Sequence, residues 1–129
     1  MNDNSLPQDL LDAAKTVLPH AYSKYSNFQV ACAVRGVDGA IYAGCNVESA
    51  SYTPTICAEG GAISAMVAAG CHEITEVLVL VDDDKLCTPC GVCRQRLSEM
   101  AASDVVVHMC TLKGLYQTET VGVLLPLAY

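Results

Sequence analysis

The sequence has few basic residues. Seven of its 129 residues are lysine or arginine, against 14 aspartates and glutamates, so the formal net charge is −7. The seven form no cluster along the chain: Lys15, Lys24, Arg35, Lys85, Arg94, Arg96 and Lys113. Nucleic acids and anionic membranes are bound largely through positive charge. The sequence therefore argues against nucleic acid and against a membrane surface as partners.

Long apolar runs are also absent. The longest lie near residues 77–81 and 121–127, far short of the ~20 residues that a membrane-spanning helix needs. Residues 1–5 lack the basic and apolar regions of a signal peptide. We therefore expect a cytoplasmic protein. In that compartment the eight cysteines are interpreted as thiols, metal ligands or catalytic groups rather than as disulfides.

The composition is otherwise that of a globular protein, with 52% hydrophobic and 16% charged residues. These proportions exclude a disordered tail and a coiled coil. A chain of this length buries roughly two thirds of the surface that its unfolded form exposes. We expect residues 1–129 to form a single domain, because no repeat or linker is visible.

Apolar periodicity predicts alternating helices and strands. A first helix is expected to begin with Ser5 as its N-cap and to end or kink at Pro19. The strands 28–35 and 41–45 flank Asp38-Gly39, which is a strong hairpin signal.

The second half of the sequence predicts two more helices and three more strands. The features are a helix over 58–69 with Gly70 at its end, a strand at 76–81, a helix opened by Thr88 as N-cap and Pro89, and strands at 105–110 and 117–123. This order predicts an α/β fold with one mixed five-stranded sheet flanked by helices.

The strongest chemical signal is Cys90-Gly91-Val92-Cys93. Two cysteines at this spacing in a first helical turn point the same way and can share one metal ion. Zn²⁺ prefers four tetrahedral ligands, with Zn–S distances of about 2.3 Å. Cys57 also precedes a predicted helix and is the best candidate for a third ligand. Three cysteines leave one position open, as in a catalytic site, so we expect one Zn²⁺ per chain.

Glu59 lies two residues after Cys57 and is the natural proton carrier. The pattern Cys-Ala-Glu…Pro-Cys-x-x-Cys is the thiolate version of the zinc-deaminase signature, in which the glutamate is not a ligand. Zinc lowers the pKa of water from near 16 towards about 7. We expect Glu59 to take that proton, to pass it to a ring nitrogen and to assist the departure of ammonia.

Two alternatives remain open. Cys87 forms an overlapping Cys-x-x-Cys with Cys90, so a thiol redox protein that uses Cys87, Cys90 and Cys93 without metal is one. A non-catalytic zinc-stabilised binding module is the other. The remaining cysteines and the histidines are expected to be structural or surface residues: Cys32, Cys45, Cys71, Cys110, His20, His72 and His108.

From about residue 22 to 125, the sequence resembles the small homotetrameric cytidine deaminases. The matching segments are Tyr25–Val30, Gly44–Glu48, Ala50–Tyr52, Cys57-Ala58-Glu59, Pro89–Gln95 and Leu124–Pro126. The resemblance implies a three-layer cytidine-deaminase-like fold. It also implies deamination of cytidine and deoxycytidine to uridine and deoxyuridine in pyrimidine salvage, with zinc as cofactor and Glu59 as the catalytic residue.

The resemblance further implies a set of substrate contacts. Asn46 and Glu48 would hold the ribose hydroxyls, and Phe28 would pack on the pyrimidine ring. The backbone of Ala58 and the side chain of Glu59 would read the base. In a homotetramer, neighbouring subunits would complete each site through three residues: Ala50, Tyr52 and Tyr129.

One departure from the family concerns the metal. Gly60-Gly61 stand where many members carry Arg-Thr, and that arginine donates hydrogen bonds to the zinc-bound thiolates. Three thiolates on Zn²⁺ sum to −1, so its loss should leave a more electron-rich zinc. Arg94, Arg96 or the helix dipoles could compensate, or the glycines could widen the space near the metal. Ser49 replaces a frequent asparagine, which leaves a modified cytosine nucleoside or a blasticidin-like substrate as alternatives.

Overall fold

The computed structural model describes residues 6–129, so the predicted Ser5 N-cap and the polar start at 1–5 lie outside the described residues. Five strands form one sheet in the order β2-β1-β3-β4-β5. In chain order the elements are α1 (Gln8–Val17), η2 (Leu18–His20), β1 (Val30–Gly36), β2 (Ile41–Cys45), α2 (Ala58–Ala68), β3 (Ile74–Val81), α3 (Gly91–Met100), β4 (Ala101–Thr111), β5 (Tyr116–Thr120) and α4 (Val121–Leu124).

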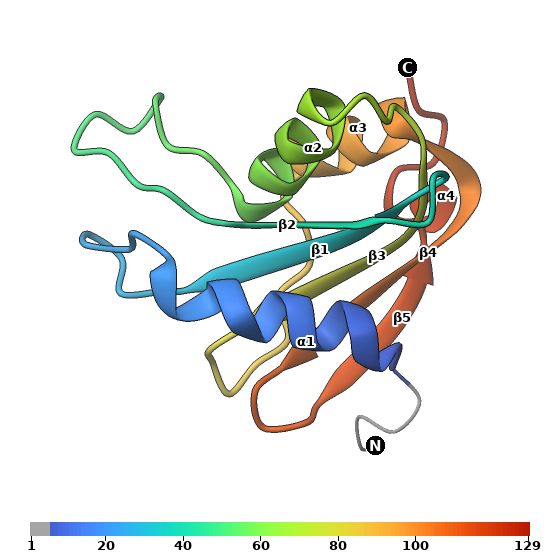
Figure 1. Ribbon diagram of the computed structural model, residues 1–129. Helices are drawn as coiled ribbons and strands as arrows, with labels where there is room; N and C mark the ends of the chain where they lie inside the picture. Colours follow the sequence, from blue (N-terminus) through green and yellow to red (C-terminus); the bar gives the residue numbers. More distant parts are fainter. Residues whose placement is uncertain (1–5) are drawn as a thin grey trace.

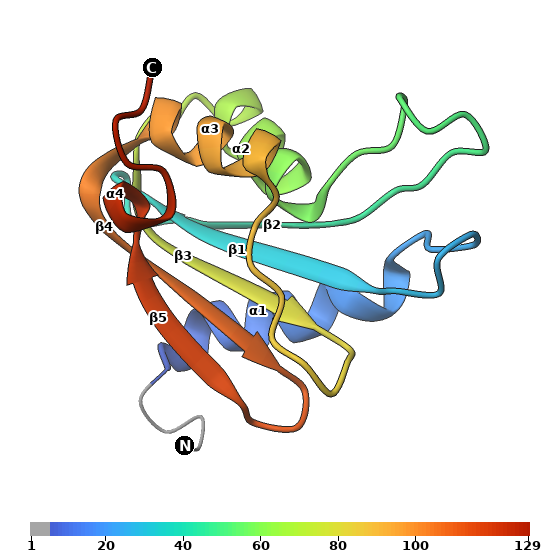
Figure 2. The ribbon, with the colours of Figure 1, turned by 180° about the vertical axis from the view of Figure 1, so that it is seen from behind.

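The sheet is the middle of three layers. Helix α1 covers one face, and α2 and α3 lie side by side on the other (Figures 1 and 2). β1 is antiparallel to both β2 and β3, β3 and β4 are parallel, and β5 is antiparallel to β4. The parallel pair requires a crossover, and α3 supplies it. The predicted mixed sheet flanked by helices is confirmed.

β3 is the central strand and is buried on both faces. Its alternate residues Val77 and Val79 face the core under α2 and α3, whereas Leu78 and Leu80 face the core under α1. This explains why its sequence is a nearly continuous apolar run rather than an alternating one. Among residues 6–129, no helix is long and apolar enough to cross a membrane.

Helix α2 lies directly against β2 because Gly44 has no side chain. A Cβ atom at residue 44 would lie 2.5 Å from the backbone nitrogen of Ala62 and 2.9 Å from the carbonyl oxygen of Ala58. Real Cβ atoms essentially never approach other atoms more closely than 3.0 Å. Gly44 therefore sets how closely α2, which carries Cys57 and Glu59 at its start, approaches the sheet.

Side-chain capping explains two of the predicted boundaries that were wrong. α3 begins at Gly91 rather than at Pro89, because the Cys90 sulfur accepts the backbone N–H of Cys93 at 3.5 Å and acts as the N-cap. The predicted strand 117–123 ends at Thr120. Its hydroxyl accepts the N–H of Val123 at 3.3 Å and begins the short helix α4.

The predicted strand 105–110 is part of the longer β4, which begins at Ala101 directly after α3. The remaining predicted elements agree with the structure to within two residues. α1 ends at Val17 and continues as the single 3-10 turn η2, which contains Pro19. The first strand of the hairpin begins at Val30, two residues later than predicted. The cysteines expected to be structural are buried or half-buried: Cys32, Cys45, Cys71 and Cys110. His108 is satisfied by Glu76 and Thr118, at 2.8 and 3.1 Å.

Candidate metal centre and active-site cavity

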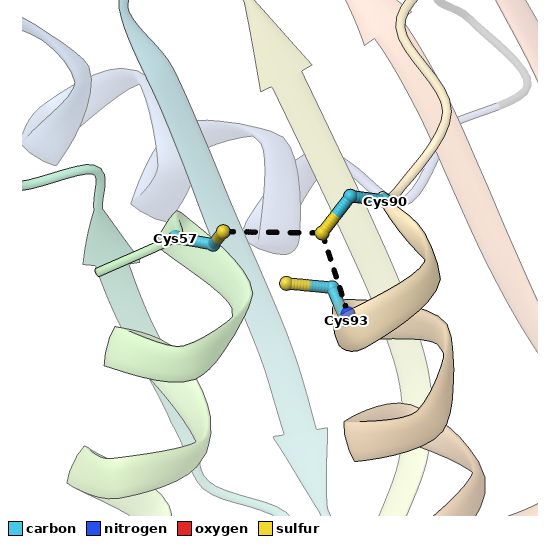
Figure 3. Close-up of side chains that lie close together, drawn as sticks. All are labelled: Cys57, Cys90 and Cys93. Carbon is cyan, nitrogen blue, oxygen red and sulfur yellow. Dashed lines mark hydrogen bonds between the residues drawn. The ribbon is translucent and has the colours of Figure 1, made fainter. Parts of the chain in front are cut away.

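Two helix N-termini meet at a cluster of three cysteines. Cys57 is the N-cap of α2, Cys90 is the N-cap of α3, and Cys93 lies in the first turn of α3 (Figure 3). Their sulfur atoms all lie within 4.8 Å of one another, and the Cys57 and Cys90 sulfurs are 4.0 Å apart. Tetrahedral zinc–thiolate geometry places sulfurs about 3.8 Å apart. The donor set and its spacing therefore fit a zinc ion.

The three thiols differ in exposure and in electrostatics. Cys93 is fully buried, and burial raises the pKa of its thiol. Burial would also raise the pKa of Cys90, but the N–H of Cys93 and the neighbouring thiols outweigh it and hold that pKa below its usual value. A coordinated thiol is deprotonated outright by the cation. The Cys93 N–H at the start of α3 supplies part of the positive field that stabilises such thiolates.

A cavity of about 410 Å³ opens beside this cluster. Cys57 and Cys90 both line it, so the ligand set is open to the cavity on that side. Glu59, in the first turn of α2, also lines it and is only 4% exposed. Burial raises the pKa of its carboxyl. A carboxyl with a raised pKa exchanges protons nearer neutral pH, which suits a proton carrier.

The segment of Asn46 and Glu48 is tied to the metal cluster by backbone bonds. Val47 lies between them and pairs with Ile56, with N···O distances of 2.9 and 2.8 Å in the two directions. Ile56 directly precedes Cys57. Tyr22 pairs with the other edge of the same segment. These two bridges bring residues far apart in the sequence to one wall of the cavity.

Asn46 has a structural role in this wall. Its side-chain oxygen accepts the N–H of Val30 at 3.0 Å, and its NH₂ group donates to the carbonyl of Phe28 at 2.8 Å. The residue is 8% exposed and lines the cavity. Asn46 therefore holds Phe28, another lining residue, in place. The side-chain oxygen and the NH₂ group of Asn46 each retain one further hydrogen-bonding site.

Glu48 holds the loop that contains Tyr25 and Ser26. Its carboxylate accepts the backbone N–H groups of Tyr25 and Ser26, both at 3.0 Å, and the Ser26 hydroxyl. The Ser26 contacts, with that of Tyr25, keep the pKa of Glu48 below its usual value. The carboxylate is thus ionised and oriented at one end of the cavity.

Six of the predicted site residues outside the metal cluster line this cavity: Phe28, Asn46, Glu48, Tyr52, Ala58 and Glu59. Ala50 and Tyr129 do not. Ala50 lies on the protruding loop between β2 and α2, and Tyr129 ends the chain on the side of α4 (Figures 1 and 2). Both residues are exposed, as is Tyr52.

Three lining residues belong to no motif in the sequence: Thr55, Ile56 and Val79. Three others lie in segments that the sequence singled out without assigning them to the site: Val30, Cys87 and Thr88. Cys87 lines the cavity, but the cysteine cluster contains Cys57 in its place. The geometry therefore groups the three cysteines expected for zinc, not the three expected for a thiol redox protein.

The two arginines of α3 have different partners. Arg94 donates to the carbonyls of Pro89 and Leu124, both at 2.8 Å, and to the Thr88 hydroxyl at 3.0 Å, so it fastens the loop before α3 to α4. Arg96 donates to the sulfur of Cys93 at 3.5 Å. Its guanidinium also occupies the space beside Gly60, so the expectation that the glycines widen the space near the metal is wrong.

Comparison with known proteins decides the family. Residues 4–109 match the family described as the cytidine and deoxycytidylate deaminase zinc-binding region. This chain belongs to that family. The shared zinc-binding region and the cluster of Cys57, Cys90 and Cys93 agree on the cofactor, which is zinc.

Individual relatives cover nearly the whole length of this deaminase-family chain. It is 36% identical over 122 residues to the cytidine deaminase of Sporosarcina psychrophila, covering 95% of this chain and 90% of the relative. It is 37% identical over 122 residues to that of Halalkalibacterium halodurans, covering 95% and 92%. The crystal structure of cytidine deaminase from Burkholderia pseudomallei superposes with a TM-score of 0.89 at 35% identity, covering 95% of this chain and 98% of that one.

Proposed function

We propose that this protein is a zinc-dependent hydrolase that deaminates cytidine and deoxycytidine to uridine and deoxyuridine. The observation that carries the proposal is the position of Glu59, a buried carboxyl that lines the same cavity as two of the three zinc ligands. The names of the relatives support the same activity. This reaction adds water at C4 of the pyrimidine and releases ammonia. We propose that it serves pyrimidine salvage.

Zinc, when bound, supplies the Lewis acidity that activates water at neutral pH. Glu59 carries the protons. It accepts one from the attacking water and delivers it to N3 of the base. It then accepts a second from the hydroxyl group added at C4, as the carbonyl forms there, and gives it to the amino group, which leaves as ammonia. Its burial separates the carboxyl from most of the surrounding solvent. Ala58, next to Glu59 in α2, lines the cavity, and its backbone is assigned to the polar edge of the base.

The part of the cavity lined by Phe28, Asn46 and Glu48 is assigned to the nucleoside. Phe28 packs on the pyrimidine ring, and its position is maintained by the bond from Asn46 to its carbonyl oxygen. The remaining hydrogen-bonding sites of Asn46 and the ionised Glu48 bind the ribose hydroxyls. These groups favour a substrate that carries a sugar over a free base.

The sites are completed in a homotetramer. Tyr52 is 90% exposed and Tyr129 is 110% exposed, and a surface tyrosine is typical of an interface. Ala50 and Tyr52 on the protruding loop, together with Tyr129, are proposed to contact the cavity of a neighbouring subunit. The protein is proposed to act in the cytoplasm on a small molecule.

The test is the ultraviolet absorbance change of cytidine on zinc-loaded protein, beside deoxycytidine and a panel of other aminopyrimidines. We expect turnover of the first two, and a loss of at least 10² in the rate for Glu59→Gln with zinc retained. If only a modified cytosine nucleoside is turned over, that nucleoside replaces cytidine as the proposed substrate. Zinc binding without turnover of any member of the panel would indicate a binding module and overturn the proposal.

A further inference from the structure

The negative charge at the metal cluster needs a partner. Three thiolates and Zn²⁺ sum to −1, and Glu59 lies beside them. The chain has only seven lysines and arginines. Arg94 donates its hydrogen bonds to the Pro89 and Leu124 carbonyls and to the Thr88 hydroxyl, so its contacts are structural. Among residues 6–129, Arg96 is the arginine that donates a hydrogen bond to a ligand sulfur.

Arg96 reaches this sulfur from an unexpected direction. It lies on α3, one helical turn after Cys93, and its Nη1 atom is 3.5 Å from the Cys93 sulfur. Its guanidinium extends across to α2. A Cβ atom at residue 60 would lie 3.2 Å from Nη1 and 3.4 Å from Cζ. One half-buried side chain therefore spans both helices that carry the zinc ligands.

Gly60 and Arg96 are thus complementary. The contact distances at residue 60 are tighter than most Cβ contacts, and the atoms that would have to move are the end of a flexible side chain. An alanine at residue 60 would require the guanidinium to move by a few tenths of an ångström from the position in which it contacts Cys93. Glycine inside a helix is unfavourable by about 1 kcal/mol relative to alanine, so Gly60 runs against the helix preference of α2.

We propose that Arg96 is a positioning residue for the zinc site, which orients the Cys93 thiolate and offsets the charge of the three ligands, and that Gly60 leaves the space in which its guanidinium lies. Arg96 does not line the cavity, so it acts through Cys93 rather than on substrate. A hydrogen bond to a metal ligand typically contributes 10- to 100-fold in metal affinity. The inference concerns zinc binding and rests on the proposed function for its kinetic readout alone.

The primary experiment measures zinc affinity by competition with a chromophoric chelator, for the parent, Arg96→Met, Arg96→Lys and Gly60→Ala. We expect Arg96→Met to bind zinc 10- to 100-fold more weakly. Arg96→Lys should recover part of the affinity, because it restores the charge without the planar guanidinium. The zinc affinity of Gly60→Ala should fall as well, in the same direction as that of Arg96→Met. Circular dichroism establishes that each variant is folded before the titration.

Arg35→Met is the matched control, because it removes the same charge on the opposite face of the sheet, where Arg35 pairs with Asp9. We expect its zinc affinity to stay within about twofold of the parent. The double variant Gly60→Arg, Arg96→Met moves the guanidinium to the other helix and is expected to regain affinity relative to Arg96→Met alone. In Co²⁺-substituted protein, the thiolate-to-metal absorption should shift in Arg96→Met and not in Arg35→Met.

The kinetic readout separates this role from a general structural one. For Arg96→Met at saturating zinc, kcat for cytidine should fall while KM stays within about twofold, because Arg96 does not line the cavity. An unchanged zinc affinity in Arg96→Met would overturn the inference, as would an equal loss in Arg35→Met. An unchanged affinity in Gly60→Ala would overturn the part assigned to Gly60. If the parent has no deaminase activity, the zinc titrations still decide this inference while the proposed function fails.

Discussion

The close approach of α2 to β2 makes Gly44→Ala the most informative single substitution in the scaffold. The new Cβ would lie 2.5 Å from the nitrogen of Ala62, 2.7 Å from the carbonyl carbon of Gly61 and 2.9 Å from the oxygen of Ala58. All three atoms belong to the backbone of α2. No side-chain rotation relieves such contacts, so the helix itself has to move away from the strand.

The size of the effect follows from these distances. Ordinary contacts begin at 3.4 Å, so α2 must move by a substantial part of an ångström. Overpacking of a core costs about 1–3 kcal/mol, and three simultaneous backbone contacts place this case near ~3 kcal/mol. At about 4 °C per kcal/mol for a domain of this size, the melting temperature should fall by about 12 °C.

The same movement should reduce catalysis. α2 carries Cys57 and Glu59, whereas the other two ligands lie on α3. A shift of α2 therefore changes the spacing of the cluster and the position of the proton carrier together. Misplacement of a catalytic group by ~1 Å can cost about 10²-fold in rate. We expect a loss of this size for Gly44→Ala, together with weaker zinc retention.

Gly61→Ala is the matched control. Its Cβ would lie 3.5 Å or more from the nearest atoms, which is ordinary contact, and alanine favours a helix by about 1 kcal/mol over glycine. Urea unfolding of zinc-loaded protein, zinc content and the rate of cytidine loss are measured on both variants. The reasoning is refuted if Gly44→Ala unfolds within ~0.5 kcal/mol of the parent and keeps its rate, or if Gly61→Ala is the more destabilised of the two.

Three further predictions address the site. Cys90→Ala should lose zinc and stability together, because it removes a ligand and the N-cap of α3; full zinc occupancy by elemental analysis would contradict its assignment. Asn46→Ala leaves the Val30 N–H and the Phe28 carbonyl unpaired, which should cost about 1–3 kcal/mol in urea unfolding and raise KM; a stability equal to the parent would contradict the bridging role. Glu48 has a lowered pKa, so its ionised form contributes stability above its unfolded pKa of about 4.3, and that contribution is lost as the pH falls through the lower folded pKa. The difference in unfolding free energy between the parent and Glu48→Gln should therefore be constant above pH ~5 and shrink below pH ~4; a difference independent of pH would refute it.

The zinc ligands could be predicted from the sequence because their signals are local. Cys90 and Cys93 lie within one helical turn, and Cys57 is followed by the carboxylate that the chemistry needs. Helix starts, the Asp38-Gly39 turn and the apolar run of β3 are local patterns as well. Their physical causes act over a few neighbouring residues, so the order of the elements was predicted correctly.

The errors concern side chains whose hydrogen-bonding partner the pattern does not name. Thr88 was expected to cap α3, but its hydroxyl accepts from Arg94 and the Cys90 sulfur takes the cap. The strand 117–123 was expected to continue through Val121, but Thr120 caps a new helix instead. In both regions the boundary is set by the side chain that accepts a backbone N–H of the helix, Cys90 in one and Thr120 in the other.

The fold class, the family and the three zinc ligands could be predicted from the sequence, because hydrophobic periodicity and motif spacing are properties of the chain. Which residues from distant segments meet is known only from the folded structure. Val47 pairs with Ile56, which precedes Cys57. The absence of a side chain at Gly44 lets α2 pack closely on β2, and the guanidinium of Arg96 lies beside Gly60. Such contacts depend on the packing of whole elements against one another, and no short segment of sequence contains that information.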